Sequence, residues 1–328
     1  MMNRRAFLCA MTGVLVLAEP LAARAQAAAT LRRIGWLAPG EPAPPAVFET
    51  RDVRFRELGW IEGRNLLIER RYANNRGELL RTLAEELVRL KVEVIVTQGT
   101  AATLAAKEAT ATIPIVMWSA GDPVGGGLVA SLARPGGNVT GYSLLSPESD
   151  VKRLSLLREL LPASQRVGEL ANSTNPYFRT VRKDVEEAYQ SLGMQPIFVE
   201  VAQASELEHA VADVVRQRGQ ALHVPNDDLF WDNRDGIIRA ALGHALPTIV
   251  DRDEVLEAGG LLSYSFSVTE LQRRGVAFID KILRGAKPGD LPVEQPTQFE
   301  LGINLKTAKA LGITVPQSLL LRADKVIQ

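Results

Sequence analysis

VIVTQGTAATL, residues 94–104, joins an apolar run to a helical pattern through the short turn Gln98-Gly99. The β-branched run predicts a strand over residues 92–97, and the alanine-rich pattern predicts a helix over residues 100–109. A phosphate-binding P-loop makes the same transition, but it carries a Lys where this stretch has only small, neutral residues. The backbone amides at the start of such a helix can still receive an anionic group of a ligand.

The same alternation of short apolar runs and longer helical patterns continues along the chain. It predicts an α/β fold in which parallel sheets are covered by helices. The expected strands cover residues 34–38, 66–71, 92–97, 113–118, 138–143, 167–171, 196–201, 221–225, 247–250, 260–265 and 299–304. The expected helices cover residues 47–58, 77–90, 100–109, 126–133, 147–160, 176–192, 205–217, 231–244 and 268–283, with a short helix near the end.

Two lobes are expected, because the chain is longer than a single core usually supports. The βα pattern restarts after Ser143 without a Gly/Ser linker, and a proline-rich stretch follows the helix that ends near residue 283. Both features suit a chain that crosses between lobes more than once. We therefore expect lobe 1 to comprise residues 30–143 and 266–290, and lobe 2 to comprise residues 144–265 and 291–328.

The N-terminal residues read as a cleaved secretory signal. Arg4 and Arg5 precede an apolar stretch, and Ala23-Arg24-Ala25 fits a cleavage site, so we expect residues 1–25 to be removed on export to the periplasm by the Sec or the Tat route. The single cysteine, Cys9, lies in this segment. The mature chain would then lack cysteine nucleophiles, thiolate metal sites and iron–sulfur clusters.

The charge balance excludes classes of partner that need a basic field. The 38 basic and 38 acidic side chains give a net charge of zero, so neither nucleic acid nor an anionic lipid surface is an expected partner. The three histidines, at positions 209, 223 and 244, show neither a metal-ligand spacing nor a catalytic triad pattern. We expect no metal, no cofactor and no enzymatic activity; His223 is expected to be a core or rim residue.

Polar residues recur just after the predicted strands, and ligands of open parallel sheets bind beyond those strand ends. Amides and hydroxyls at a helix start can receive a carboxylate, and Asp122 or Asp227 can accept from an ammonium group. Tyr142 and Tyr264 flank the expected crossings between the lobes and can stack on a ligand. The same polar residues are also common helix caps. The candidate ligand residues are Gln98, Gly99, Thr100, Ser119, Asp122, Tyr142, Asn172, Ser173, Thr174, Asn226, Asp227 and Tyr264.

Six segments together resemble a known family. They are RRIGWLAPG (32–40), FRELGWIEGRNLLIERRYA (55–73), LAEELVRLKVEVIVTQGT (83–100), IPIVMWSAGDPVGGGLVASLARPGGNVTGYS (113–143), EAGGLLSYS (257–265) and DLPVEQPTQFELGINLKTAKALGITVP (290–316). The chain is similar to ABC transporter substrate-binding proteins of the tryptophan or aromatic-amino-acid-binding type. The resemblance implies a type I periplasmic binding protein fold, with two Rossmann-like lobes, three crossovers and hinge closure over the ligand.

The resemblance also implies which loops face the ligand and which partners to expect. Thr100, Ser119 and Asp122 would face it from lobe 1, and lobe 2 would contribute the residues Asn172, Ser173, Asn226 and Asp227. The expected ligand is an amino acid or a related small carboxylate. The expected partner is an ABC permease in the inner membrane, and this protein itself is expected to be a monomer. Two alternatives share the fold: a secreted hydrolase or isomerase with Asp122 or Asp227 as its base, and a ligand-sensing domain.

Overall fold

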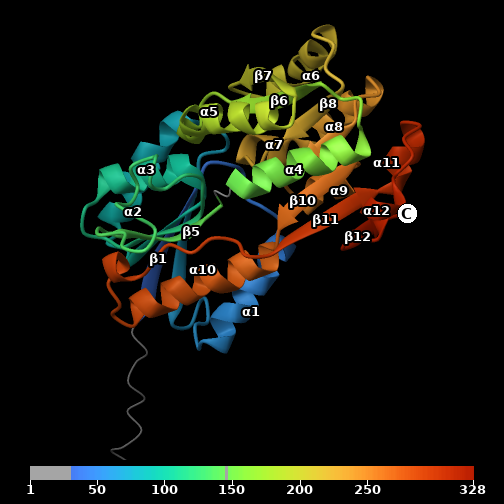
Figure 1. Ribbon diagram of the computed structural model, residues 1–328. Helices are drawn as coiled ribbons and strands as arrows, with labels where there is room; N and C mark the ends of the chain where they lie inside the picture. The colour runs from blue at the N-terminus through green and yellow to red at the C-terminus, as the bar shows by residue number, and fades with distance from the viewer. Residues whose placement is uncertain (1–30, 145–146) are drawn as a thin grey trace, which may run out of the picture.

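The computed structural model describes residues 31–144 and 147–328. The expected signal segment, with Cys9, lies outside the described residues. The described chain forms two α/β lobes, one built mainly from its first part and one from its middle and end (Figure 1). Within the described ranges, no helix combines the length and the apolar character that a membrane span requires.

Lobe 1 is built on a five-stranded sheet in which every neighbouring pair is parallel. Its strand order is β2-β1-β3-β4-β5, with β1 Arg32–Ala38, β2 Leu66–Tyr72, β3 Val94–Thr97, β4 Ile115–Ala120 and β5 Val139–Ser143. Its helices are α1 Glu49–Glu57, α2 Leu80–Arg89 and α3 Gly99–Ala109, with short 3-10 turns at Pro45–Phe48 and Gly77–Leu79. The late helix α10 Val268–Leu283 packs beside α1 and completes this lobe (Figure 1).

Lobe 2 is built on a seven-stranded sheet, in the order β12-β11-β10-β9-β8-β6-β7. Its strands are β6 Arg166–Asn172, β7 Gln195–Val201, β8 Ala221–Val224, β9 Thr248–Val250, β10 Leu262–Phe266, β11 Phe299–Asn304 and β12 Lys325–Ile327. Its helices are α4 Pro147–Leu160, α5 Pro176–Ser191, α6 Leu207–Arg216, α7 Asp228–Asp232, α8 Arg234–Gly243, α9 Asp253–Glu257, α11 Leu305–Ala310 and α12 Gln317–Leu320, with a 3-10 turn at Ala204–Glu206. A further 3-10 turn, Pro288–Asp290, follows α10 and packs near β5 of lobe 1.

Both faces of each sheet are buried, as parallel sheets covered by helices require. In lobe 1, Trp36 and Val96 pack into one apolar cluster, and Leu37 and Ile95 pack into another. Successive strand residues point to opposite faces, so neighbours in the sequence belong to different clusters. The near-continuous apolar runs of the sequence follow from this double burial.

The chain passes between the lobes three times: after β5, after β10, and between Val293 and β11. At the third passage, the backbone amide of Glu294 donates to the carbonyl of Gly141 at 3.0 Å, and the amide of Ser143 donates to the carbonyl of Glu294 at 2.9 Å. β11 enters its sheet on the return from lobe 1, and it is antiparallel to β10. The two-lobed α/β fold is therefore confirmed, with one antiparallel pair in a sheet expected to be parallel. The chosen lobe boundaries, residues 143, 266 and 290, stay a prediction.

The helix expected over residues 126–133 is wrong. The segment forms turns instead, in which the amides of Leu128 and Val129 both donate to the carbonyl of Pro123. Gly127 has a φ of 67°, which breaks a right-handed helix after a single turn. The helix expected over residues 231–244 also differs, since it begins earlier, at Asp228, and is interrupted at Asn233. The elements α9, α12 and β12 were not expected.

Candidate ligand-binding site

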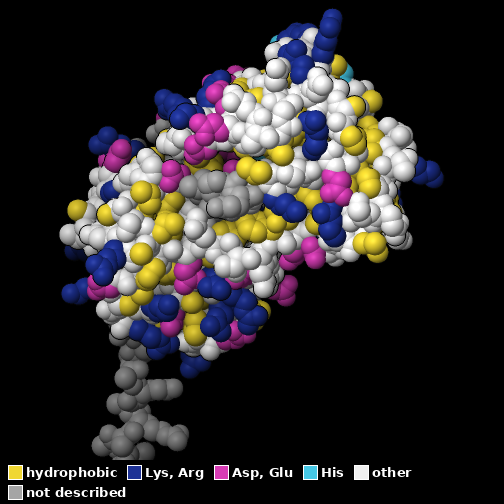
Figure 2. Space-filling model, viewed as in Figure 1, with side chains coloured by type: hydrophobic (Ala, Val, Ile, Leu, Met, Phe, Trp, Pro, Cys, Tyr) yellow, Lys and Arg dark blue, Asp and Glu magenta, His cyan; other side chains and the backbone are white. Residues whose placement is uncertain are grey.

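A cavity of about 190 Å³ lies between the two lobes. For comparison, an apolar cavity of about 150 Å³ binds benzene, so this volume admits a small organic ligand with an aromatic ring. Its walls come from the carboxyl ends of strands in both sheets: β3 and β4 in lobe 1, and β6, β8 and β9 in lobe 2. Over the face that Figure 2 shows, both signs of charge occur together around this junction.

The lobe 1 wall is largely aromatic. Trp118, at the end of β4, lines the cavity and packs edge-on against Trp36, with 5.0 Å between the ring centroids. Phe48 also lines the cavity and packs on Trp36 at 5.6 Å, and the guanidinium of Arg51 lies 4.2 Å from the ring centroid of Phe48. Tyr72 extends the same wall. Such a surface suits a flat apolar group.

The start of α3 supplies the polar part of the lobe 1 wall. Gln98 precedes the helix, and its side chain makes no capping hydrogen bond. Gly99 has a φ of 75°, a conformation that glycine adopts at low cost, so the chain can turn from β3 into the helix at the cavity wall. The Thr100 hydroxyl accepts from the backbone amide of Gly121 at 2.9 Å and ties this turn to the end of β4.

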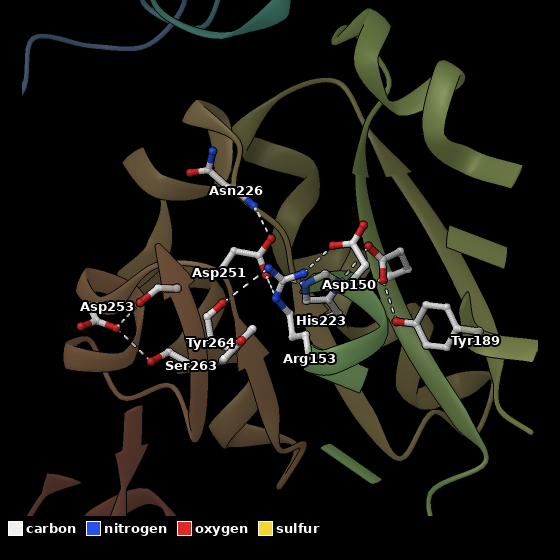
Figure 3. Close-up of polar contacts among 11 residues, drawn as sticks. Asp150, Arg153, Tyr189, His223, Asn226, Asp251, Asp253, Ser263 and Tyr264 are labelled. Atoms are coloured by element: carbon white, nitrogen blue, oxygen red, sulfur yellow. Dashed lines mark hydrogen bonds and ion pairs between the residues drawn. The ribbon is translucent and has the colours of Figure 1, made fainter. Parts of the chain in front are cut away.

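The lobe 2 wall carries a buried network of charged side chains, drawn in Figure 3. Arg153 from α4 donates to Asp150 at 2.6 Å and pairs with Asp251 at 2.6 Å. His223 from β8 lies between Asp251, at 2.8 Å, and Glu169, at 2.8 Å. We call these five residues the ionic cluster; all of them line the cavity. The Tyr189 hydroxyl donates to Glu169 at 2.6 Å and completes it.

The cluster sets the protonation of its members. Burial alone would lower the pKa of His223, but the adjacent carboxylates of Glu169 and Asp251 outweigh it and raise that pKa to about 10. Burial opposes the charge of Asp251 as well, yet Arg153 and His223 hold the pKa of its carboxyl below the usual value. For Asp150, burial dominates and raises the pKa of the carboxyl. His223 is therefore an imidazolium at neutral pH.

Seven of the twelve residues predicted from the sequence line the cavity. They are Gln98, Gly99, Thr100, Ser119, Asn172, Asn226 and Asp227. Asp227 is nevertheless occupied by protein groups: its two oxygens accept from the side-chain amides of Asn172, at 2.9 Å, and Asn175, at 2.8 Å. The backbone amide of Leu229 donates to the first of these oxygens at 2.9 Å, so Asp227 caps α7. Whether these residues contact a ligand stays a prediction.

The other five residues lie outside this cavity. Asp122 holds its own turn, since one of its oxygens accepts from the amides of Val124 and Gly125 at 3.1 and 2.8 Å. Tyr142 is buried in the lobe 1 core, and Tyr264 stacks on Phe299 with 5.3 Å between the rings. The remaining two are Ser173, whose hydroxyl donates to the carbonyl of Val201, and Thr174, which lines a small neighbouring pocket.

Sequence reasoning missed the ionic cluster as a site. A signal was present, because Glu169 and His223 are charged or polar residues inside apolar strands, and Asp251 follows β9 directly. In the sheet, Glu169 and His223 are partners in register on neighbouring strands. The sequence expectation that His223 is a core or rim residue agrees with its burial, although the buried ring lines the cavity.

Several contacts cross directly from one lobe to the other. The side chain of Gln98 donates to Asp228 on α7. One oxygen of Asp232, on the same helix, accepts from the backbone amide of Glu41 at 3.0 Å and from the side chain of Asn75 at 2.7 Å. These hydrogen bonds hold the rims of the lobes together around the cavity. Across residues 31–144 and 147–328, no group of three or more His, Cys, Asp or Glu side chains is placed to bind a metal ion.

The chain matches known proteins over most of its length. Residues 54–327 match the sequence model of a family described as ABC transporter substrate binding protein. The tyrosine-binding protein of Clostridioides difficile (strain R20291) is 28% identical over 258 residues, which are 78% of this chain and 74% of that protein.

Two solved structures resemble this one. A domain from Streptococcus pneumonia in complex with L-Trp is 26% identical, with a TM-score of 0.84 over 91% of this chain and all of that one. A ligand-free, open substrate-binding protein with adhesive properties from Clostridium difficile is 25% identical, with a TM-score of 0.63 over 90% of this chain and 99% of that one. At similar identity, this chain superposes better on the ligand-bound structure than on the open one.

Proposed function

The chain belongs to the family of ABC transporter substrate-binding proteins, and on that premise we propose that it captures an aromatic amino acid between its two lobes. The observation that carries the proposal is the cavity between the lobes, which has an aromatic wall on one side and an ionic wall on the other. A protein similar to this one binds tyrosine, and another is solved with L-Trp. The family binds its substrates without transforming them, so the hydrolase or isomerase alternative is not favoured.

The aromatic wall supports an aromatic side chain in the ligand. Trp118 and Phe48 approach the cavity from lobe 1, and Phe230 and Phe266 line it as well. Edge-to-face or offset contacts with such rings contribute about 0.5–1.5 kcal/mol per pair beyond the burial of apolar area. A small aliphatic amino acid would leave part of this wall without a partner.

The start of α3 supports a carboxylate in the ligand. The amides of its first turn lie at the cavity wall without a side-chain cap, between Gln98 and Thr100. A carboxylate there gains hydrogen bonds from these amides and about 0.3–1 kcal/mol from the helix dipole. Ser119, which lines the cavity after the neighbouring strand, adds a hydroxyl.

The cellular role follows from the family and the sequence. We place the mature protein in the periplasm, after removal of residues 1–25 by the Sec or the Tat route. There it acts as a monomer, binds the ligand by hinge closure and delivers it to an ABC permease in the inner membrane. Differential contacts from both lobes favour the closed state over the open one.

The test is a thermal-shift screen of the mature protein against L-tryptophan, L-tyrosine, L-phenylalanine, L-leucine and 3,4-dihydroxybenzoate. We expect at least one aromatic amino acid to raise the melting temperature most, since a ligand at 100 times its Kd stabilises the native state by about 2.7 kcal/mol. Chromatography of the incubated ligand should recover it unchanged. Stabilisation by another class alone would overturn the ligand assignment, and a reaction product would support an enzyme.

A further inference from the structure

We infer that Asp150 receives the ammonium group of the ligand and thereby selects amino acids over the same carboxylates without the amine. The inference rests on the proposed function, because it assigns a role within the same cavity. Asp150 lies in the first turns of α4, on the lobe 2 wall and in contact with Arg153 (Figure 3). Sequence reasoning did not single it out.

The free acceptor of Asp150 is the first observation. Its Oδ1 accepts from Arg153 at 2.6 Å, whereas its Oδ2 has no hydrogen-bond partner within the described ranges. The side chain is 34% exposed, the most of the three carboxylates in the ionic cluster, and the residue lines the cavity. A carboxylate that is pinned at one oxygen and open at the other is oriented to accept from an ammonium group.

The charge of the ionic cluster is the second observation. With its carboxylates ionised, the cluster holds the negative charges of Asp150, Glu169 and Asp251 against the positive charges of Arg153 and His223. The cluster therefore has one negative charge in excess, and a buried charge without a partner is costly. A cation at the open oxygen of Asp150 balances it, whereas an anionic group there would add to the excess.

The two carboxylates expected from the sequence are less suitable acceptors. Asp122 lies outside the cavity and caps its own turn. Asp227 uses both oxygens for protein donors. Other carboxylates also line the cavity. Asp228 keeps one oxygen open, but its other oxygen receives the side chain of Gln98 from lobe 1, and Asp232 accepts two donors from lobe 1.

The assignment gives each lobe one end of the backbone of an amino acid. The carboxylate meets the start of α3 in lobe 1, and the ammonium group meets Asp150 in lobe 2. Only the zwitterion engages both lobes through charged groups. A carboxylate without the amine lacks the second contact, so it should bind more weakly and favour closure less.

The test is isothermal titration calorimetry with L-tryptophan and with 3-indolepropionate, which differs only by the missing amine. We expect the wild-type protein to prefer tryptophan by roughly 10–100-fold. Asp150→Asn preserves the size of the side chain but removes its charge, and it should reduce the preference to less than about threefold, chiefly through weaker tryptophan binding. Asp122→Asn is the matched control, because Asp122 lies outside the cavity, and it should keep the wild-type preference. Asp228→Asn tests the rival acceptor, and the assignment to Asp150 predicts that the preference for the amine persists in this variant.

The outcomes separate the two proposals. A wild-type protein that binds no aromatic amino acid would overturn the proposed function. A preference that persists in Asp150→Asn, or that is lost in Asp228→Asn instead, would overturn only the role of Asp150. If Asp150→Asn fails to fold, a crystal structure of the wild-type complex with tryptophan decides: the ammonium nitrogen must lie within hydrogen-bond distance of Asp150 Oδ2, and its placement at another carboxylate would overturn the inference.

Discussion

His223 shows how a single buried residue can depend on its neighbours. It lies within hydrogen-bond distance of two carboxylates, and their attraction outweighs the cost of burying its charge. Removing one partner of a buried ion pair strongly destabilises the fold, because the other charge is left uncompensated. The stability of lobe 2 should therefore depend on the imidazolium of His223.

We predict that His223→Gln lowers the free energy of unfolding by about 3–5 kcal/mol at pH 6, because Glu169 and Asp251 lose their shared cation. The folded-state pKa of His223 is raised from 6.5 to about 10, so its contribution is fully present below pH 6.5 and is lost as the pH rises toward 10. The difference in the free energy of unfolding between the wild type and His223→Gln should therefore become smaller as the pH rises from 6 to 10. Urea unfolding at pH 6, 8 and 10 measures it.

The matched control for this prediction is His209→Gln. Its side chain lies on α6 and is 71% exposed, so the change should stay within about 0.5 kcal/mol at each pH. An equal loss of stability at pH 6 and pH 10 in His223→Gln would contradict the ionic role of His223. In that case the loss would come from packing alone.

The residues of the candidate site differ in how far the sequence could predict them. Gln98, Thr100 and Asn172 could be predicted as cavity residues, because the carboxyl end of a parallel strand is a local feature of the sequence. The pairing of Glu169 with His223 could not. β6 and β8 are neighbours in the sheet, but β7 lies between them in the chain, and their register is set by the folded sheet.

At the scale of elements, strands and helices with a clear apolar period could be predicted closely. The bounds of α4, α10 and β11 coincide with the expected ranges. The predicted helix over residues 126–133 failed because local turn chemistry prevailed: Asp122 and the glycine run close a turn before a helix can extend. Tyr142 was placed correctly near a crossing, but its side chain faces the core of lobe 1 rather than the cavity.

The two lobes approach each other closely where Gly121, at the end of β4, faces Tyr177, at the start of α5. A methyl group added at Gly121 would lie 2.1 Å from the ring of Tyr177, and the three atoms nearest to it all belong to that ring. Gly121 is not among the glycines with a positive φ, so its backbone accepts alanine. Glycine at this position is therefore required by the approach of Tyr177 rather than by lobe 1 itself.

We predict that Gly121→Ala weakens the binding of L-tryptophan at least about tenfold, because the added methyl group blocks full closure. The unliganded melting temperature should change little. In a Tyr177→Ala background, Gly121→Ala should weaken the affinity for L-tryptophan by less than about twofold, since the obstructing ring is absent. Calorimetric titration of the four proteins gives the coupling directly.

Gly137→Ala is the control for Gly121→Ala, because it makes the same change at another glycine of lobe 1. An added methyl group there meets no atom within 4 Å, so binding should stay at the wild-type level. Gly121→Ala with wild-type affinity would show that the ligand-bound state does not bring β4 and α5 this close. A loss of affinity that persists in the Tyr177→Ala background would point to a local effect in lobe 1.

At the scale of the whole molecule, the described structure has its lobes drawn together. Side chains and backbone from lobe 1 bond directly to Asp228 and Asp232 on α7, and the cavity lies between the two lobes. The three passages of the chain are where a hinge between the lobes would lie. The central claim is that the ligand shifts the protein from an open arrangement to this one.

The most direct test is a measurement of the distance between spin labels on the two rims. The described residues contain no cysteine, so Glu78→Cys and Ser205→Cys place one label on each lobe, beside the small pocket that both rims line. Electron–electron resonance should show longer distances without ligand, and saturating L-tryptophan should shift them to a single shorter distance that matches this structure. An unchanged distance distribution at saturation would contradict capture by closure.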